Sequence, residues 1–138
     1  MRQRRLSITI SMFNLFKSES QDKPVALVAV IKGSQVNIKT TKNGFVRAIG
    51  YGNFGNPINC QVSPDFKLVI ATTDKGIICL SETNVGGIRR TFGTTSVFGP
   101  GAKAISVSWI NNEKVLVNTN KGANYELNVR TGGTKKIS

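Results

Sequence analysis

Short runs rich in β-branched and apolar residues follow one another along most of the chain, and small turn-forming groups separate them. In the middle of the chain the runs are "INCQVS" (58–63), "KLVIATT" (67–73), "IICLSET" (77–83) and "IRRTF" (88–92). The groups between them, "PDF", "DKG" and "NVGG", are typical of tight turns in antiparallel hairpins. This pattern predicts four consecutive antiparallel strands.

A sustained 3.6-residue apolar period over ten residues is missing from the sequence, so we expect almost no helix. One exception is "MFNLFKSES" (12–20), which is compatible with a short helical turn or a loose first strand. The last part of the chain repeats the strand and turn order of the middle part. Its runs are "AISVSWI" (104–110), "KVLVNT" (114–119), "ANYELNV" (123–129) and "TKKIS" (134–138).

A Lys-Gly pair recurs at spacings of 43 and 46 residues, as Lys32-Gly33, Lys75-Gly76 and Lys121-Gly122. The same shifts place Arg47 on Arg90 and Gly86-Gly87 on Gly132-Gly133. Agreement at several turn positions indicates an internal repeat. We therefore divide the chain into a basic N-terminal extension (1–21) and a β-repeat domain (22–138), with copies at about 22–52, 57–93 and 104–138.

The segment "VSPDFKLVIATTDKGIICLSETNVGGI" (62–88) resembles a blade of the WD-repeat type or of a related β-propeller family. It has the Ser-Pro-Asp turn, an apolar strand, a polar turn with glycine and a further strand. "LSE" (80–82) stands where that family has Trp-Asp, and the chain contains no Gly-His pair. The resemblance implies four-stranded antiparallel blades around an axis, and an interaction platform more than an enzyme.

We accordingly expect an all-β protein built of three four-stranded antiparallel blade-like repeats. Known closed propellers have about four to eight blades, so three blades cannot close a ring. We expect the propeller to be completed by oligomerisation, with the chain itself as partner and two chains giving six blades. The alternative is a β-sandwich or a small barrel.

The net charge of the chain indicates the chemical character of its partner. The chain has 19 Lys and Arg against 7 Asp and Glu, a formal net charge of +12. Such a balance favours an acidic protein surface or nucleic acid as partner. On the blade interpretation the basic residues recur on outer strands and on equivalent turns. The candidate partner-binding residues are Arg47, Arg89, Arg90, Lys135 and Lys136 on outer strands, Lys32, Lys75 and Lys121 at turns, and Arg2, Arg4 and Arg5 in the extension.

The basic rim and two aromatic residues in loops each have a structural explanation that competes with a binding role. Edge strands carry Lys and Arg simply to discourage edge-to-edge aggregation, which alone explains a basic rim. Phe54 and Phe98, each followed by glycine in corresponding loops, could grip a sugar, a base or a neighbouring subunit. Such residues more often fill the seam between blades, and we favour that interpretation.

Catalysis and metal binding have little support in the composition. The chain has no His, and its two cysteines, Cys60 and Cys79, do not have metal-ligand spacing. Most carboxylates fall in expected turns, where solvated acids are ordinary. We expect no catalytic residue, no cofactor and no metal, and a protein that is not an enzyme.

The longest apolar runs are far shorter than the ~20 residues of a membrane helix, so no span is expected. The basic N-terminus fits a signal peptide poorly, because Ser and Thr interrupt its apolar stretch and Met12 offers an alternative start. We expect an intracellular location or one within a viral or nucleoprotein assembly.

The functional expectation is a self-associating structural or docking subunit of a larger assembly, such as a virus particle or a nucleoprotein complex. A basic rim would contact its acidic partner. The alternatives are a carbohydrate-binding oligomeric propeller of the lectin type and a nucleic-acid-binding protein.

Overall fold

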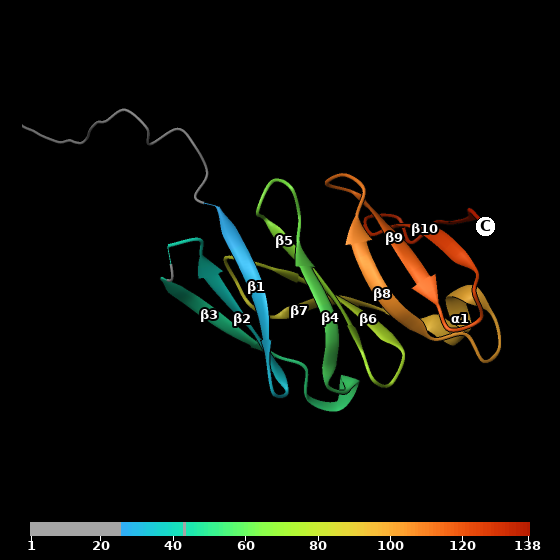
Figure 1. Ribbon diagram of the computed structural model, residues 1–138, viewed down its shortest axis with the longest axis horizontal. Helices are drawn as coiled ribbons and strands as arrows, with labels where there is room; N and C mark the ends of the chain where they lie inside the picture. The colour runs from blue at the N-terminus through green and yellow to red at the C-terminus, as the bar shows by residue number, and fades with distance from the viewer. Residues whose placement is uncertain (1–25, 43) are drawn as a thin grey trace, which may run out of the picture.

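The computed structural model describes residues 26–42 and 44–138, which form three antiparallel sheets lying side by side (Figure 1). Within each sheet the strands follow one another in chain order. Sheet 1 contains β1 (Leu27–Lys32), β2 (Gln35–Thr40) and β3 (Phe45–Gly50). Sheet 2 contains β4 (Pro57–Val62), β5 (Leu68–Thr73), β6 (Ile77–Glu82) and β7 (Ile88–Gly93). Sheet 3 contains β8 (Ala104–Trp109), β9 (Lys114–Thr119), β10 (Asn124–Asn128) and β11 (Thr134–Lys136).

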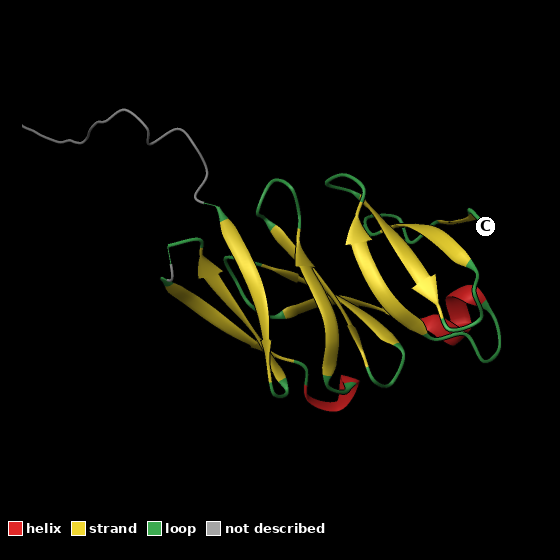
Figure 2. Ribbon diagram, in the orientation of Figure 1, coloured by secondary structure: helices red, strands yellow, loops and turns green. Residues whose placement is uncertain are grey.

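Helical structure is confined to two short segments in the described residues (Figure 2). The 3-10 turn η2 (Gly52–Phe54) joins sheets 1 and 2, and α1 (Thr94–Phe98) joins sheets 2 and 3. The predicted all-β class with blade-like antiparallel repeats is confirmed. Sheet 1 departs from the four-stranded expectation, since the described residues give it three strands. The extension 1–21 and the segment 12–20 lie outside the described residues.

Strand direction identifies which strand of a blade each one represents. In Figure 1, β4 and β8 run upward, whereas β1 runs downward together with β5 and β9. The three strands of sheet 1 thus correspond to the second, third and fourth strands of sheets 2 and 3. A register shift at Ile38/Lys39, matched by one at Leu80/Ser81, supports this correspondence. Among the described residues, sheet 1 has no counterpart of β4 or β8.

Two of the three Lys-Gly turns are the same structure. The amide of Gly76 donates to the carbonyl of Thr73 (3.0 Å), and the amide of Gly122 donates to that of Thr119 (3.2 Å). Both glycines have positive φ, which L side chains adopt only with strain. In the first hairpin, by contrast, Lys32 is the last residue of β1 and pairs with Gln35 of β2. This turn is therefore shorter than the other two. The sequence shift of 43 residues therefore does not hold throughout the first repeat.

The apolar core lies in two layers between the sheets, which also explains why β5 and β6 are buried on both faces. Val69, Ala71 and Cys79 pack toward sheet 1. Ile70 and Ile78, on the opposite face of sheet 2, pack toward sheet 3. Because successive side chains of a strand alternate between its faces, one strand serves both layers. Sheet 2 is thus the central blade of a stack.

Candidate functional site

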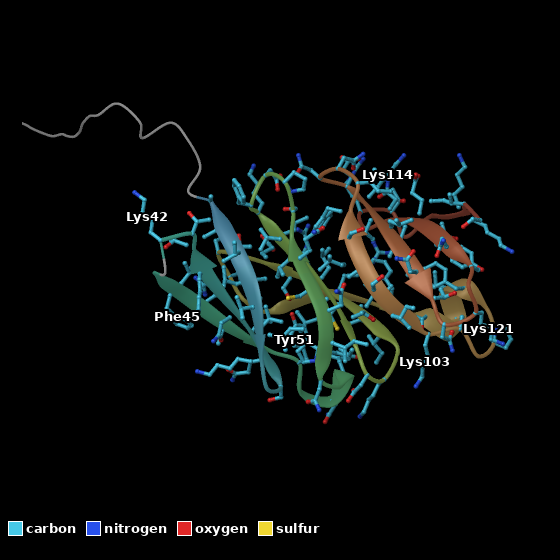
Figure 3. The ribbon with its side chains drawn as sticks, viewed as in Figure 1. Lys42, Phe45, Tyr51, Lys103, Lys114 and Lys121 are labelled. Carbon is cyan, nitrogen blue, oxygen red and sulfur yellow. The ribbon has the colours of Figure 1, made fainter. Side chains whose placement is uncertain are left out.

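Four lysines lie along one edge of the stack, which we call the lysine edge: Lys32, Lys75, Lys103 and Lys121. Lys32 ends β1, and Lys75 and Lys121 occupy the β5–β6 and β9–β10 turns. Lys103 immediately precedes β8. All three hairpin turns lie at the lower edge in Figure 1, and Figure 3 shows Lys103 and Lys121 there. Sequence analysis predicted three of these lysines and missed Lys103.

The backbone beside these lysines is fixed by the same hydrogen-bond pair in two successive sheets. The amide of Asn56 donates to Asp74 Oδ1 (3.0 Å), while the amide of Asp74 donates to the carbonyl of Asn56 (2.9 Å). The amide of Lys103 donates to Asn120 Oδ1 (2.8 Å), and the amide of Asn120 donates to the Lys103 carbonyl (2.9 Å). Each turn is therefore tied to the residue before the first strand of its sheet, β4 or β8, and these bonds fix the backbone that carries the lysines.

Glycines make room for the lysine side chains. A Cβ at Gly76 would lie 3.2 Å from Cγ of Lys103, and one at Gly101 would lie 3.1 Å from Nζ of Lys121. Lys75 Nζ donates to the carbonyl of Asn53 at 3.2 Å. Lys75, Lys103 and Lys121 thus form one continuous row across sheets 2 and 3.

The lysine edge carries a surplus of positive charge. Of the described acids only Asp74 lies on this edge, and its carboxylate accepts the Asn56 amide. Three of the remaining acids form ion pairs away from this edge. These pairs are Arg89–Glu82 (3.7 Å), Lys114–Glu126 (3.3 Å) and Arg130–Glu113 (3.5 Å). The acids therefore neutralise the rest of the surface more than they neutralise the lysine edge.

A groove opens at the opposite edge, between the turns of sheets 2 and 3. It has a volume of about 350 Å³, and Leu68, Leu80 and Val129 give it apolar walls. Its charged rim consists of Arg89, Arg90, Arg130, Asp65 and Glu113. Because both positive and negative side chains line this groove, its electrostatic potential does not have one sign that would attract an anion or a cation selectively.

Arg47 and Arg90, predicted on the basic rim, make contacts within the chain. Arg47 Nη1 donates to the carbonyl of Val85 in the next sheet (3.2 Å). Arg90 Nη1 donates to the carbonyl of Arg130 (2.8 Å), and its guanidinium carbon lies 4.8 Å from the centroid of the Phe92 ring. These two arginines hold successive sheets together. Their partner-binding role stays a prediction.

The remaining rim residues are exposed. Arg89 belongs to the outermost strand of sheet 2, and Lys135 and Lys136 belong to that of sheet 3. Arg2, Arg4 and Arg5 lie outside the described residues. The basic residues thus divide into outer-strand residues, partly engaged, and the lysine edge.

Phe54 and Phe98 pack inside the stack. Phe54 is half-buried against the layer between sheets 1 and 2. Phe98 is half-buried against the other layer and stacks on Tyr125 with ring centroids 4.4 Å apart. These contacts agree with the seam-filling interpretation.

Burial disfavours ionisation of the two thiols and of the Tyr51 phenol. Desolvation raises the pKa of Cys79 to about 12 and also raises that of Cys60. It raises the pKa of Tyr51 as well, with smaller contributions from Cys79 and Cys60. All three groups are therefore protonated at neutral pH. In the part of the chain that the structure describes, no three Cys, Asp or Glu residues gather as metal ligands.

The comparisons with known proteins support the fold. No protein-family model matches the chain, and no curated protein sequence matches it. Solved structures do match. A structure of the mitotic checkpoint complex aligns at a TM-score of 0.66 with 19% identity, over 84% of this chain and 34% of that one.

Two further structures are similar. BamB from Moraxella catarrhalis aligns at a TM-score of 0.62 with 15% identity, over 87% of this chain and 36% of its own. The C-terminal WD40 domain of Sif2 aligns at 0.59 with 13% identity, over 75% of this chain and 28% of its own. The chain has a β-propeller-like fold and spans about a third of the length of these structures. Within the described residues no helix is long and apolar enough to cross a membrane.

Proposed function

We propose that this protein is a non-enzymatic docking subunit of a larger nucleoprotein assembly, and that its lysine edge binds nucleic-acid phosphates. The observation that carries the proposal is the row of Lys75, Lys103 and Lys121. Paired hydrogen bonds fix the backbone at these positions, and of the described acids only Asp74, which accepts the Asn56 amide, lies on the same edge. Lysine ammonium groups neutralise phosphates without reading sequence. The expected binding is therefore electrostatic and independent of base sequence.

The composition of the lysine edge favours a phosphate backbone over an acidic protein surface. Tight protein interfaces depend on aromatic or arginine anchors in dry pockets. The aromatic residues of the neighbouring loops, Phe54 and Phe98, are half-buried in the stack. The same packing gives a sugar no aromatic platform from these two residues.

Self-association also belongs to this proposal. The three-sheet stack spans about a third of the propellers that it matches, and a stack of sheets has two end faces. A soluble homo-oligomer commonly covers such faces through symmetric contacts.

A salt titration tests the proposed function. The full chain is titrated into fluorescent double-stranded DNA of two unrelated sequences, and into polyglutamate, at several salt concentrations. We expect equal affinity for both DNA sequences and a log–log salt slope of about −3, from roughly three or four neutralised phosphates. Tighter binding to polyglutamate than to DNA would favour an acidic protein partner. No binding to either at low salt would refute the proposal.

A further inference from the structure

We propose that the lysine edge binds single-stranded nucleic acid in preference to a duplex, with Ile58 and Ile105 contacting the faces of unstacked bases. The inference rests on the proposed function and names the form of nucleic acid that the same edge takes. In this arrangement the lysines neutralise phosphates, while the two isoleucines provide an apolar surface for bases.

The first strands of sheets 2 and 3 carry a β-bulge at the same position. In β4 the register shifts at Ile58, which pairs with no residue of β5. In β8 the register shifts at Ile105, which pairs with no residue of β9. A bulge turns a side chain out of the regular alternation of its strand, and bulges are common beside functional sites. Because the bulge recurs in successive sheets, it belongs to the repeat.

Both bulge residues are exposed although the residues before them are not. Ile58 is 49% exposed and Ile105 is 53% exposed. The preceding residues, Pro57 and Ala104, are buried. A single exposed apolar side chain is ordinary on a protein surface. The same residue type, exposed at the same bulge of two sheets, indicates a surface that contacts a ligand.

The two bulges lie beside the lysine edge. Ile105 follows Lys103 by two residues in the chain. Ile58 likewise follows Asn56, whose backbone is bonded to the β5–β6 turn that carries Lys75. In Figure 1, β4 and β8 begin at the lower edge, where the three hairpin turns also lie. Each isoleucine is therefore close to the row of lysines.

Hydrogen bonds join β4 and β8, so the two isoleucines belong to one surface. The amide of Val107 donates to Asn59 Oδ1 (2.8 Å), and the amide of Trp109 donates to Gln61 Oε1 (2.6 Å). The indole of Trp109 donates to the carbonyl of Gln61 (2.9 Å). These bonds fix the two strands side by side, and the bulge lies near the beginning of each.

This combination of charge and apolar surface favours a single strand over a duplex. Lysine ammonium groups neutralise the phosphates of either form. A duplex keeps the faces of its bases stacked inside, whereas the bases of a single strand are free to pack on protein side chains. About 7 Å of strand separates each isoleucine from the edge. A flexible strand reaches both levels, while a stiff duplex rests on the turns.

Fluorescence anisotropy of the full chain at one fixed salt concentration tests the inference with three probes. They are an oligothymidylate of about 20 nucleotides, an abasic strand of the same length and a duplex of the same length. The abasic strand has the phosphates of the oligothymidylate but no bases. We expect the oligothymidylate to bind roughly tenfold tighter than the abasic strand, and also tighter than the duplex.

Two double variants assign the base contact to the bulges. The test variant, Ile58→Thr with Ile105→Thr, keeps the charge and the β-branched shape of both residues. The control variant, Val85→Thr with Ile110→Thr, changes exposed apolar residues in the β6–β7 and β8–β9 turns of the opposite edge. We expect the test variant to lose its preference for oligothymidylate while keeping its affinity for the abasic strand and the duplex. The control should bind all three probes like wild type.

Other results would overturn the inference. Equal affinity of the wild-type chain for oligothymidylate and the abasic strand would exclude base contacts, while leaving phosphate binding by the lysine edge intact. A preference that persists in the test variant, or is lost equally in both variants, would exclude a specific role for the bulges. An equal loss of duplex affinity in the test variant would indicate an apolar wedge into a duplex.

Failure of the proposed function gives a different result. No binding of the wild-type chain to any of the three probes at low salt would refute phosphate binding itself, and with it the base contact. Unchanged thermal unfolding of both variants shows that they remain folded.

Discussion

Arg47 and Arg90 make the same contact in successive sheets. Each lies on the outermost strand, and each donates from Nη1 to a backbone carbonyl in the last turn of the next sheet. Beside the guanidinium lies a glycine with positive φ, Gly86 for Arg47 and Gly132 for Arg90. The contact is a repeated device that joins neighbouring sheets.

Replacing Arg90 tests that device. Arg90→Ala removes charged hydrogen bonds to carbonyls and the contact with the Phe92 ring, and should lower the free energy of unfolding by about 1–2 kcal/mol. The control is Arg89→Ala, because Arg89 makes an exposed ion pair at 3.7 Å and should cost under ~0.5 kcal/mol. Denaturant unfolding measures both. Equal effects would show that Arg90 does not join the sheets.

The glycine of the device gives a second, independent test. Gly132 has a φ of 84°, and a Cβ there would lie 2.7 Å from Arg90 Nη2. Gly132→Ala should therefore destabilise the fold by about 1–3 kcal/mol. Gly133 has an ordinary φ, and its nearest neighbour, Thr131 Oγ1, would lie 3.4 Å from a Cβ. Gly133→Ala should change thermal stability little, and a similar loss for both would contradict the account.

Removing the hydroxyl of Tyr51 should, unlike the changes above, not lower the stability of the fold. Tyr51 is almost fully buried, and within the described residues its hydroxyl has no hydrogen-bond partner. Tyr51→Phe removes an unsatisfied polar atom and should leave stability unchanged or raise it by up to about 1 kcal/mol. Thermal unfolding decides the matter. A loss of more than ~1 kcal/mol would mean that the hydroxyl has a partner, such as a buried water.

Acid should weaken the turn that precedes β5. Partial burial tends to raise the pKa of Asp65, but hydrogen bonds from the Ser63 hydroxyl and the Lys67 amide, with the Lys67 charge, lower it overall. A lowered folded-state pKa adds stability above the unfolded value, and this is lost as the pH falls through the folded value.

Asp65→Asn measures this contribution. The variant should be less stable than wild type at pH 7, and the difference should shrink below about pH 4. A difference independent of pH between 2 and 7 would contradict the assignment.

The strands and turns were predictable because their signals are local. β-branched runs such as that of β5 and the glycine turns at Gly76 and Gly122 depend on nearby residues alone. The two-residue turn at Gly33 was placed in the wrong register, since its letters match the longer turns while its pairing does not.

The site was only partly predictable. Three lysines of the lysine edge follow from the repeat, but Lys103 joins them because a hydrogen bond to Asn120 brings its loop there. The contacts of Arg47 and Arg90 run between sheets, across 38 and 40 residues, which no local pattern records. A recurring glycine opposite a recurring arginine was the one signal that could have indicated them.

The most direct test of the central claim compares two triple variants of equal charge. One replaces Lys75, Lys103 and Lys121 of the lysine edge with Gln. The control variant replaces Lys42, Lys67 and Lys114 with Gln. Figure 3 shows Lys42 and Lys114 at the opposite edge. DNA affinity is measured by fluorescence anisotropy at fixed salt. We predict a loss of roughly tenfold or more, with a shallower salt slope, for the lysine-edge variant alone. Equal losses in the two variants would show that net charge, and not the lysine edge, determines binding.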